Sequence, residues 1–321
     1  MKKTSPLASF FKIHKINKFY WKISLVLLVP LLFFSCEKEM VVIDGNQPVS
    51  TFNISKIKIE NYVQRIFIDI IGREPLEEEM IAHVALLQAD SLKRDTRMDI
   101  IQTLMNDTSF RAGEGSYKAA YILNLYNLAK IRCVEGAPDG EFNRRIGLAL
   151  NGAFRDSLEG NWDGYYEKHE AVRKFRAVLK TKDQLYEGKI GFHQMFGAMI
   201  NNGVYDVINM NTFNFVRAAF DELLWRLPTE GEFQASFTMI EHEEPAVLFG
   251  KAGSNKEEFV DILIHSPAMY EGLVIWAFQI YLKRPPTPTE VVTFLPEFVV
   301  TKDINFIISE IMVTDEYANF R

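Results

Sequence analysis

Four consecutive acidic or imidazole side chains in the segment IEHEEPAVLFG (240–250) are the first candidates for chemistry in this sequence. They are Glu241, His242, Glu243 and Glu244. Carboxylate oxygens and imidazole nitrogens bind divalent cations, so the cluster is a candidate metal site. A metal ion needs ligands that converge from one side, however, and consecutive side chains in a loop seldom converge. We therefore interpret the segment as a solvated loop, and we predict neither a metal nor another cofactor for the chain.

Histidine and carboxylate side chains also occur together in the middle of the chain. His169 and Glu170 in GYYEKHEAVRK, with His193 in GFHQMFGAM, would make an acid–base pair if the fold brought them together. The sequence contains no HExxH, GxSxG or paired-carboxylate signature to support this chemistry. We therefore place these histidines on a helix surface or in the core, assign no catalytic residue, and favour a non-enzymatic function.

An arginine and a glutamate six residues apart recur three times. The pairs are Arg73 with Glu79, Arg226 with Glu232, and Arg284 with Glu290. Each pair closes a stretch with the pattern V-x3-F-x5-R-x-P-x3-E. Three copies of one active site in one chain would be unusual, so the recurrence favours a structural role. We expect each pair to form a bidentate bond that clamps the turn between two helices.

Each of these stretches predicts a helix that ends near the shared arginine. Valine and phenylalanine lie four residues apart and therefore on one helix face, which we expect to be buried. These residues are Val63 and Phe67, Val216 and Phe220, and Val274 and Phe278. The arginine suits the negative end of the helix dipole, and the proline two residues later stops the helix. Thr229 and Thr287 then cap the next helix in the second and third stretches, where the first stretch has Leu76.

Helical periodicity continues through the rest of the chain and predicts an all-α fold. Apolar residues recur at i, i+3, i+4 and i+7, and no run alternates as a strand would. Two further helices follow each repeated stretch, so the unit is a three-helix element of about fifty residues. We divide the chain into a signal peptide, a flexible tether, a first unit, a helical insert and two further units. Their residues are 1–35, 36–55, 56–110, 111–210, 211–268 and 269–321.

The residues at the ends and starts of these predicted helices resemble the motifs of a known family. The motif R-x-P-T-x-x-E, followed by L-I-H-S-P-x-x-Y, is similar to a domain of unknown function that accompanies cytochrome c modules in planctomycete proteins. The matching residues are Gly72, Arg73, Leu224, Arg226 to Thr229, Glu232, Ser266 and Pro267. The resemblance covers the three repeated units and implies a helical fold, but it carries no catalytic residues. The sequence contains no cytochrome module and no CxxCH haem-attachment motif.

Residues 1–35 have the pattern of a bacterial lipoprotein signal peptide. Six lysines precede the apolar run ISLVLLVPLLFF (23–34). As a helix this run would be about 18 Å long, short of the roughly 30 Å hydrocarbon core of a membrane. Ser35 and Cys36 then resemble a lipobox, with Phe33 where leucine is usual. The resemblance implies cleavage before Cys36 and acylation of this cysteine, with palmitate among the acyl groups. An ordinary secretory signal with an incidental cysteine is the alternative.

The residues after the cysteine indicate the compartment. Glu37 differs from the aspartate that retains lipoproteins in the inner membrane, and Glu37 with Glu39 resembles the surface-export signal of Bacteroidetes lipoproteins. We therefore expect an outer-membrane protein that is anchored in the membrane through Cys36 and is either periplasmic or surface-exposed. The tripeptide DSL occurs twice, at 90–92 and 156–158, and is similar to the O-glycosylation sequon of the same bacteria. Its serines are Ser91 and Ser157.

Charge and cysteine content argue against several classes of function. The chain has 36 basic and 42 acidic residues and a net charge of −6. Cleavage before Cys36 removes six lysines and no acidic residue, so the mature charge is −12, which argues against nucleic acid as a partner. Cys133 would be the one thiol left beside the acylated cysteine, so no intrachain disulfide can form. The apolar residues around Cys133 favour a buried, structural cysteine.

These observations favour a non-enzymatic interaction or assembly module of a cell-envelope complex, with an envelope protein as partner. One alternative is an envelope hydrolase or glycan-acting enzyme with its site in the insert, 111–210, where aromatic side chains with polar tips are concentrated. These are Tyr117, Tyr121, Tyr126, Tyr165, Tyr166, Tyr186, Tyr205 and Trp162. The spacing of Tyr117 and Tyr121 favours a core stripe instead. The other alternative is an accessory protein to a separate cytochrome.

Overall fold

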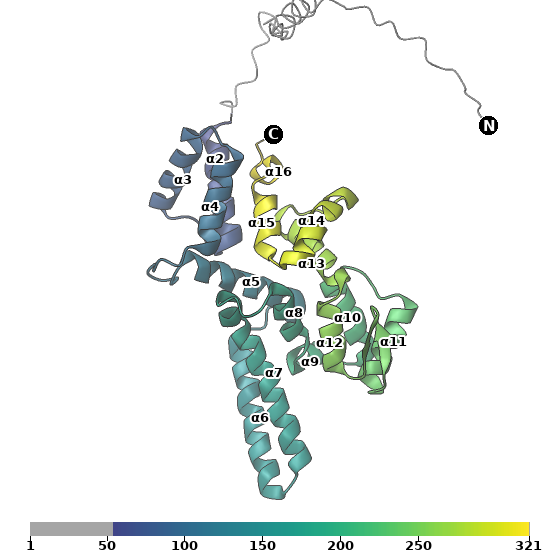
Figure 1. The fold of residues 1–321 in the computed structure, drawn as a ribbon. Helices are drawn as coiled ribbons and strands as arrows, with labels where there is room; N and C mark the ends of the chain where they lie inside the picture. Colours follow the sequence, from purple (N-terminus) through teal and green to yellow (C-terminus); the bar gives the residue numbers. More distant parts are fainter. Residues whose placement is uncertain (1–53, 321) are drawn as a thin grey trace, which may run out of the picture. The chain divides into compact units, whose positions relative to one another are not determined.

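The computed structural model describes residues 54–320, which fold into α-helices with one small two-stranded sheet (Figure 1). The all-α class predicted from the periodicity is therefore confirmed. The predicted signal peptide, Cys36 and nearly all of the predicted tether lie outside the described residues. Within 54–320, no helix combines the length and the apolar character needed to span a bilayer.

Each of the three repeated stretches forms a helix and a turn, and two further helices follow. The first stretch leads to α2 (Lys56–Ile71), α3 (Glu77–Ala89) and α4 (Arg94–Asn106). The second leads to α10 (Thr212–Leu224), α11 (Glu230–Glu241) and α12 (Lys256–Ile264). The third leads to α13 (Pro267–Tyr281), α14 (Pro288–Thr301), α15 (Ile304–Met312) and the short α16 (Asp315–Ala318). The order of helices up to the third is the same in all three.

A left-handed residue precedes the shared arginine at the end of each first helix. Gly72, Trp225 and Lys283 have φ values of 84°, 55° and 57°. Such a residue ends a helix because its N–H turns back to the carbonyls of the last turn, as the N–H of Gly72 does to Phe67 and Ile68. Glycine adopts this conformation freely, whereas tryptophan and lysine do so at a cost of roughly 1 kcal/mol. The shared sequence pattern does not reveal this common feature of the turns.

A short β-hairpin connects α11 with α12, where the sequence predicts a loop. β1 (Ala246–Leu248) pairs antiparallel with β2 (Lys251–Gly253). The connecting residues Phe249 and Gly250 have φ values of 50° and 76°, because a two-residue hairpin turn requires left-handed residues. Strands of three residues are too short for side-chain alternation to be visible in a sequence. The expectation that the chain forms no strand is therefore wrong at this point.

The predicted insert contains five helices. They are α5 (Tyr117–Val134), α6 (Asp139–Glu159), α7 (Trp162–Tyr186), α8 (Phe192–Ile200) and α9 (Gly203–Asn209). α5 packs against α2, α4, α7 and α8, so it joins the first unit to the rest of the insert. α6 packs chiefly against α7, and the two form a long antiparallel hairpin that turns at Gly160 and Asn161 (Figure 1). α8 and α9 contact α12 and α10 of the second unit.

One continuous apolar core runs through the units and the insert. The six valines and phenylalanines of the repeated stretches have exposed fractions of 2% or less, which confirms that they are buried. They are Val63, Phe67, Val216, Phe220, Val274 and Phe278. Cys133, Tyr117 and Tyr121 are also buried, as expected. Helices α10 and α13 approach so closely that a Cβ at Gly272 would lie 2.0 Å from the carbonyl oxygen of Leu223, so this contact requires glycine.

The last helices of the described chain pack against the first unit. α15 contacts α4, and α16 contacts α2. The hydroxyl of Tyr317 donates to the carboxylate of Asp69 at 2.8 Å, and the buried Arg97 pairs with Asp315 at 2.9 Å. The first and third units are therefore neighbours in the fold, although the insert and the second unit separate them in the sequence.

Candidate functional site

The three Arg–Glu pairs each form two parallel hydrogen bonds across the turn after the first helix of a unit. The two N–O distances are 2.7 and 2.9 Å for Arg73–Glu79, 2.7 and 2.6 Å for Arg226–Glu232, and 2.9 and 2.7 Å for Arg284–Glu290. The same glutamate accepts a hydrogen bond from the backbone N–H of the residue that precedes the next helix. These N–H groups belong to Leu76, Thr229 and Thr287. One carboxylate thus ties the end of one helix to the start of the next.

Arginine pairing also keeps these glutamates ionised. The arginine hydrogen bond is the main cause that lowers the pKa of Glu232 and of Glu290 to about 2. At Glu79, burial raises the pKa, but hydrogen bonds from its arginine and from Tyr117 outweigh burial and lower the value to about 2. A carboxylate with so low a pKa does not act as a general acid near neutral pH.

The guanidinium groups of Arg73 and Arg284 are saturated. All five N–H groups of each arginine donate to protein oxygens. In each case two bonds go to the paired glutamate, two to a second carboxylate, and one to the carbonyl of the next residue. The second carboxylate belongs to Glu114 and to Glu316, respectively. No donor is left for a ligand, which favours the structural role expected of these pairs.

Arg226 differs from the other two arginines. Three of its N–H groups donate as in the other units, but no second carboxylate within 54–320 bonds its Nε edge. In the third unit that carboxylate is Glu316, two residues after the threonine that caps α16. The corresponding position in the second unit, two residues after the serine that caps α13, is occupied by Ala268.

The acidic cluster and the two DSL serines lie apart from these pairs. Residues 241–244 are exposed at the end of α11, where Glu241 accepts a hydrogen bond from Thr212 at 2.6 Å. In the part of the chain that the structure describes, no three His, Cys, Asp or Glu side chains are grouped to hold a metal ion. Ser91 is exposed in the turn between α3 and α4, whereas Ser157 is half-buried on α6. Glycosylation at either serine stays a prediction.

The histidines of the insert lie in different surroundings. His169 is exposed on α7, with its ring 4.3 Å from that of Tyr165, and Glu170 pairs with an arginine of the same helix. His193 is on α8, is only 4% exposed, and lies 5.3 Å from the ring of His265. No hydrogen bond or ring contact between residues 54 and 320 joins His169 to His193, so the acid–base pair considered above has no structural support.

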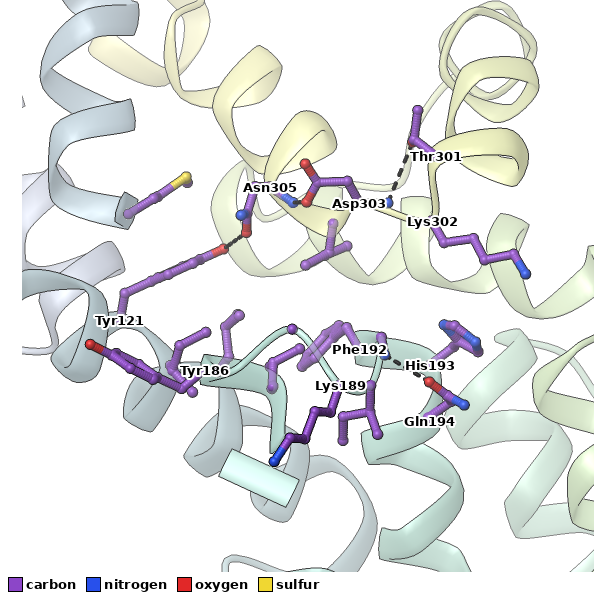
Figure 2. A pocket seen from close by; sticks show the side chains of 18 of the residues that line it. Tyr121, Tyr186, Lys189, Phe192, His193, Gln194, Thr301, Lys302, Asp303 and Asn305 are labelled. Carbon is purple, nitrogen blue, oxygen red and sulfur yellow. Dashed lines mark hydrogen bonds between the residues drawn. The ribbon is translucent and has the colours of Figure 1, made fainter. Parts of the chain in front are cut away.

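His193 lines a pocket of about 490 Å³ where α5, the α7–α8 connection and the α14–α15 connection meet (Figure 2). Figure 2 shows Thr301 to Asn305 facing the segment from Tyr186 to Gln194 across the pocket. The hydroxyl of Tyr121 donates to the side-chain oxygen of Asn305 at 2.8 Å and closes one side. Burial, and then the neighbouring His265 and Lys302, lower the pKa of His193 to about 4, so its ring is neutral at pH 7. The spacing of residues in the sequence does not reveal this pocket, because its walls come from distant segments.

The end of the α6–α7 hairpin exposes four large side chains. Phe154 and Leu158 on α6 have exposed fractions of 64% and 72%, and Trp162 and Tyr166 on α7 have 55% and 66%. All four lie within about two helical turns of Gly160, and the two on each helix share a face. The sequence draws attention to Trp162 and Tyr166 through the aromatic content of the insert, but not to Phe154 and Leu158.

Comparison with known proteins identifies no relative. No protein-family model, curated protein or solved structure matches the chain. The resemblance to the planctomycete domain therefore rests on the helix-ending motifs alone. The function has to be argued from the pocket and the surface of the described residues.

Proposed function

We propose that this protein is a non-enzymatic outer-membrane lipoprotein that acts as an interaction module of a cell-envelope complex. It binds a protein partner through the end of the α6–α7 hairpin. The observation that carries this proposal is the exposure of four large side chains at that end. The membrane anchor on Cys36 is supported by the leader sequence, in which lysines, an apolar run and Ser35 precede the cysteine.

The hairpin is held together by contacts that do not involve the four exposed side chains. A Cβ at Gly152 of α6 would lie 2.9 Å from the side chain of Lys168 on α7, so the two helices are in close contact. Lys168 also pairs with Asp156, and the side chain of Asn161 caps the start of α7. The apolar groups at the end of the hairpin are therefore available for another molecule.

The chemistry of the exposed side chains suits a protein interface. Single exposed apolar residues are common on protein surfaces. Four of them around one turn form a concentration of the kind that marks interaction sites, where tryptophan and tyrosine contribute much of the binding energy. Burial of each side chain by a partner would contribute about 1.5–3 kcal/mol before the entropic cost of association.

Charged residues near the turn favour a protein over an anionic membrane surface. Four acidic and two basic residues lie between Phe154 and Lys168, inclusive. They are Asp156, Glu159, Asp163 and Glu167, with Arg155 and Lys168. A partner with basic side chains around an apolar surface would be complementary, whereas anionic lipid would be repelled.

The two alternatives have less support in residues 54–320. An envelope hydrolase or glycan-acting enzyme would need acid and base groups that converge in the insert, but the nearest candidates, His169 and Glu170, interact with neighbours on their own helix. A role as accessory to a cytochrome rests on the family resemblance alone.

Site-specific photo-crosslinking in the native cell envelope tests the protein interface. A benzophenone amino acid at Leu158 or at Tyr166 should capture the same protein. The same group at Val300, which is 82% exposed on α14, should not. Trp162→Ala should abolish capture from both hairpin positions without lowering the melting temperature, because its ring is a contact rather than a core group. Equal capture at Val300, or adducts with lipid alone, would refute the proposal.

Metabolic labelling with a palmitate analogue tests the anchor separately. The wild-type chain should incorporate the label, Cys36→Ala should not, and the control Cys133→Ala should incorporate it as the wild type does. Label retained by Cys36→Ala would rule out acylation at this residue.

A further inference from the structure

The pocket in Figure 2 gathers positive charge in a protein whose net charge is −6. Three lysines and one aspartate line it. They are Lys118, Lys189, Lys302 and Asp303. The ammonium of Lys118 lies 4.7 Å from the ring centre of Tyr186, and Lys189 pairs with a glutamate at 2.6 Å. The ammonium of Lys302 forms no ion pair or hydrogen bond with any residue from 54 to 320, and is therefore available to a ligand.

His193 contributes a buried polar side chain without a partner. It is 4% exposed, and neither ring nitrogen forms a hydrogen bond to another described residue. Its ring contacts are with His265 at 5.3 Å and Tyr270 at 5.5 Å. No nitrogen of His193 is among the fully buried polar atoms that lack a partner in the described chain, so the imidazole reaches the pocket and can bond a ligand there. Gly191 allows this placement, because a Cβ there would lie 2.6 Å from Cε1 of His193.

Two helices of nine residues, α8 and α15, begin at this pocket. The first N–H groups of a helix carry partial positive charge, which favours an anion nearby. The carboxylate of Asp303 accepts the N–H of Asn305 at 3.0 Å, so this one negative side chain of the pocket is engaged in capping α15. At α8 no side chain caps the first turn, since the residue before the helix is Gly191, whose own N–H donates to the side-chain oxygen of the neutral Gln194 at 2.8 Å.

We propose that this pocket binds a small molecule through an oxyanion, a phosphate or a carboxylate group, with Lys302 and His193 as its principal donors. Such a ligand would neutralise the ammonium of Lys302 and provide the hydrogen bond that His193 lacks. Burial is the largest cause that lowers the pKa of His193, followed by His265 and Lys302, and a bound anion would act in the opposite direction by favouring the protonated ring. The volume of about 490 Å³ has room for a monosaccharide that carries such a group, beside the rings of Tyr121 and Tyr186.

Calorimetric titration of the full chain in detergent with three matched sugars tests the proposal. Glucose 6-phosphate and glucuronate carry a phosphate and a carboxylate, respectively, and glucose carries neither. At least one of the two anions should bind at least tenfold more tightly than glucose, which is roughly the contribution of one charge-assisted hydrogen bond. The tighter of the two identifies the oxyanion. Binding of glucose as tight as that of both anions, or no binding of either anion at millimolar concentration, would overturn the proposal.

Two variants localise the binding. Lys302→Gln should weaken binding of the anion about tenfold, whereas Lys251→Gln, which removes an exposed lysine from β2, should leave it unchanged. The imidazole resonances of His193 should shift on titration with the bound anion, and those of His169 should not. An equal loss of affinity in both lysine variants, or an unperturbed His193, would show that the anion binds elsewhere.

Discussion

Among residues 54–320, no carboxylate bonds the guanidinium edge of Arg226 that matches the edge bonded by Glu114 and Glu316 on the other two shared arginines. A glutamate in place of Ala268 would stand at the position that matches Glu316, in the first turn of α13, where the helix dipole also favours negative charge. We expect Ala268→Glu to raise the free energy of unfolding by about 0.5–1 kcal/mol, the range for a partly exposed ion pair. Urea denaturation at low salt measures this, with Ala268→Gln as the uncharged control. Equal stability of the two variants would show that the second unit does not correspond to the third at this position.

Glu222 on α10 is another residue whose chemistry the sequence does not reveal. Burial raises the pKa of its carboxyl group from 4.5 to about 7, and its Oε2 is buried without a hydrogen-bond partner in the described range. Because the pKa is higher in the folded state, ionisation opposes folding. The stability that the protonated group contributes is complete below pH 4.5 and is lost as the pH rises through about 7.

The substitution Glu222→Gln tests this pH dependence. We expect it to remove up to about 3 kcal/mol of the loss of stability between about pH 5 and pH 8, because glutamine stays neutral throughout. Urea denaturation at the two pH values measures the difference. Glu297→Gln, exposed on α14, should retain the pH dependence of the wild type. A wild-type profile in Glu222→Gln would mean that the carboxyl group is solvated in solution.

At the scale of the helices, the three repeated stretches also share a contact between the arginine and the phenylalanine ring of their common pattern. In each, the guanidinium carbon of the shared arginine lies over the ring of the shared phenylalanine, 5.7, 5.4 and 5.2 Å from its centre. The phenylalanines are Phe67, Phe220 and Phe278. Each phenylalanine ring therefore packs against both the apolar core and the arginine of the Arg–Glu pair. The position of the first helix of each unit depends on this ring. That the complete three-helix element is one repeated unit stays a prediction.

Phe220→Ala tests the role of this ring in the second unit. Loss of a fully buried phenylalanine should lower the free energy of unfolding by about 3–5 kcal/mol, because it removes apolar contacts and leaves a cavity. Phe213→Ala is the matched control on the same helix, since Phe213 is 50% exposed and its loss should cost about 1 kcal/mol or less. Thermal and urea denaturation measure both variants. Similar losses would show that the first helix is not anchored by its phenylalanine.

At the scale of the whole described chain, long-range contacts bring the first and third units together. The ion pair between Arg97 and Asp315 and the hydrogen bond from Tyr317 to Asp69 join segments near the two ends of the described range. The insert then contacts all three units through α5, α8 and α9. This arrangement places the α14–α15 connection beside the α7–α8 connection and so creates the pocket in Figure 2. The hairpin end, by contrast, belongs to α6 and α7 alone.

The sequence by itself determined the helical class, the burial of the valine and phenylalanine pairs, and the arginine and glutamate that meet across each turn. These features depend on residues at most ten positions apart, so periodicity, capping and side-chain reach are enough to predict them. Only the tertiary structure decided the pocket, because Lys302 and His193 are more than a hundred residues apart in the chain and the packing of the third unit against the insert brings the walls of the pocket together. It also decided the exposure of Phe154 and Leu158, since an apolar pair on one helix face looks the same in a sequence whether a neighbouring helix covers it or leaves it bare.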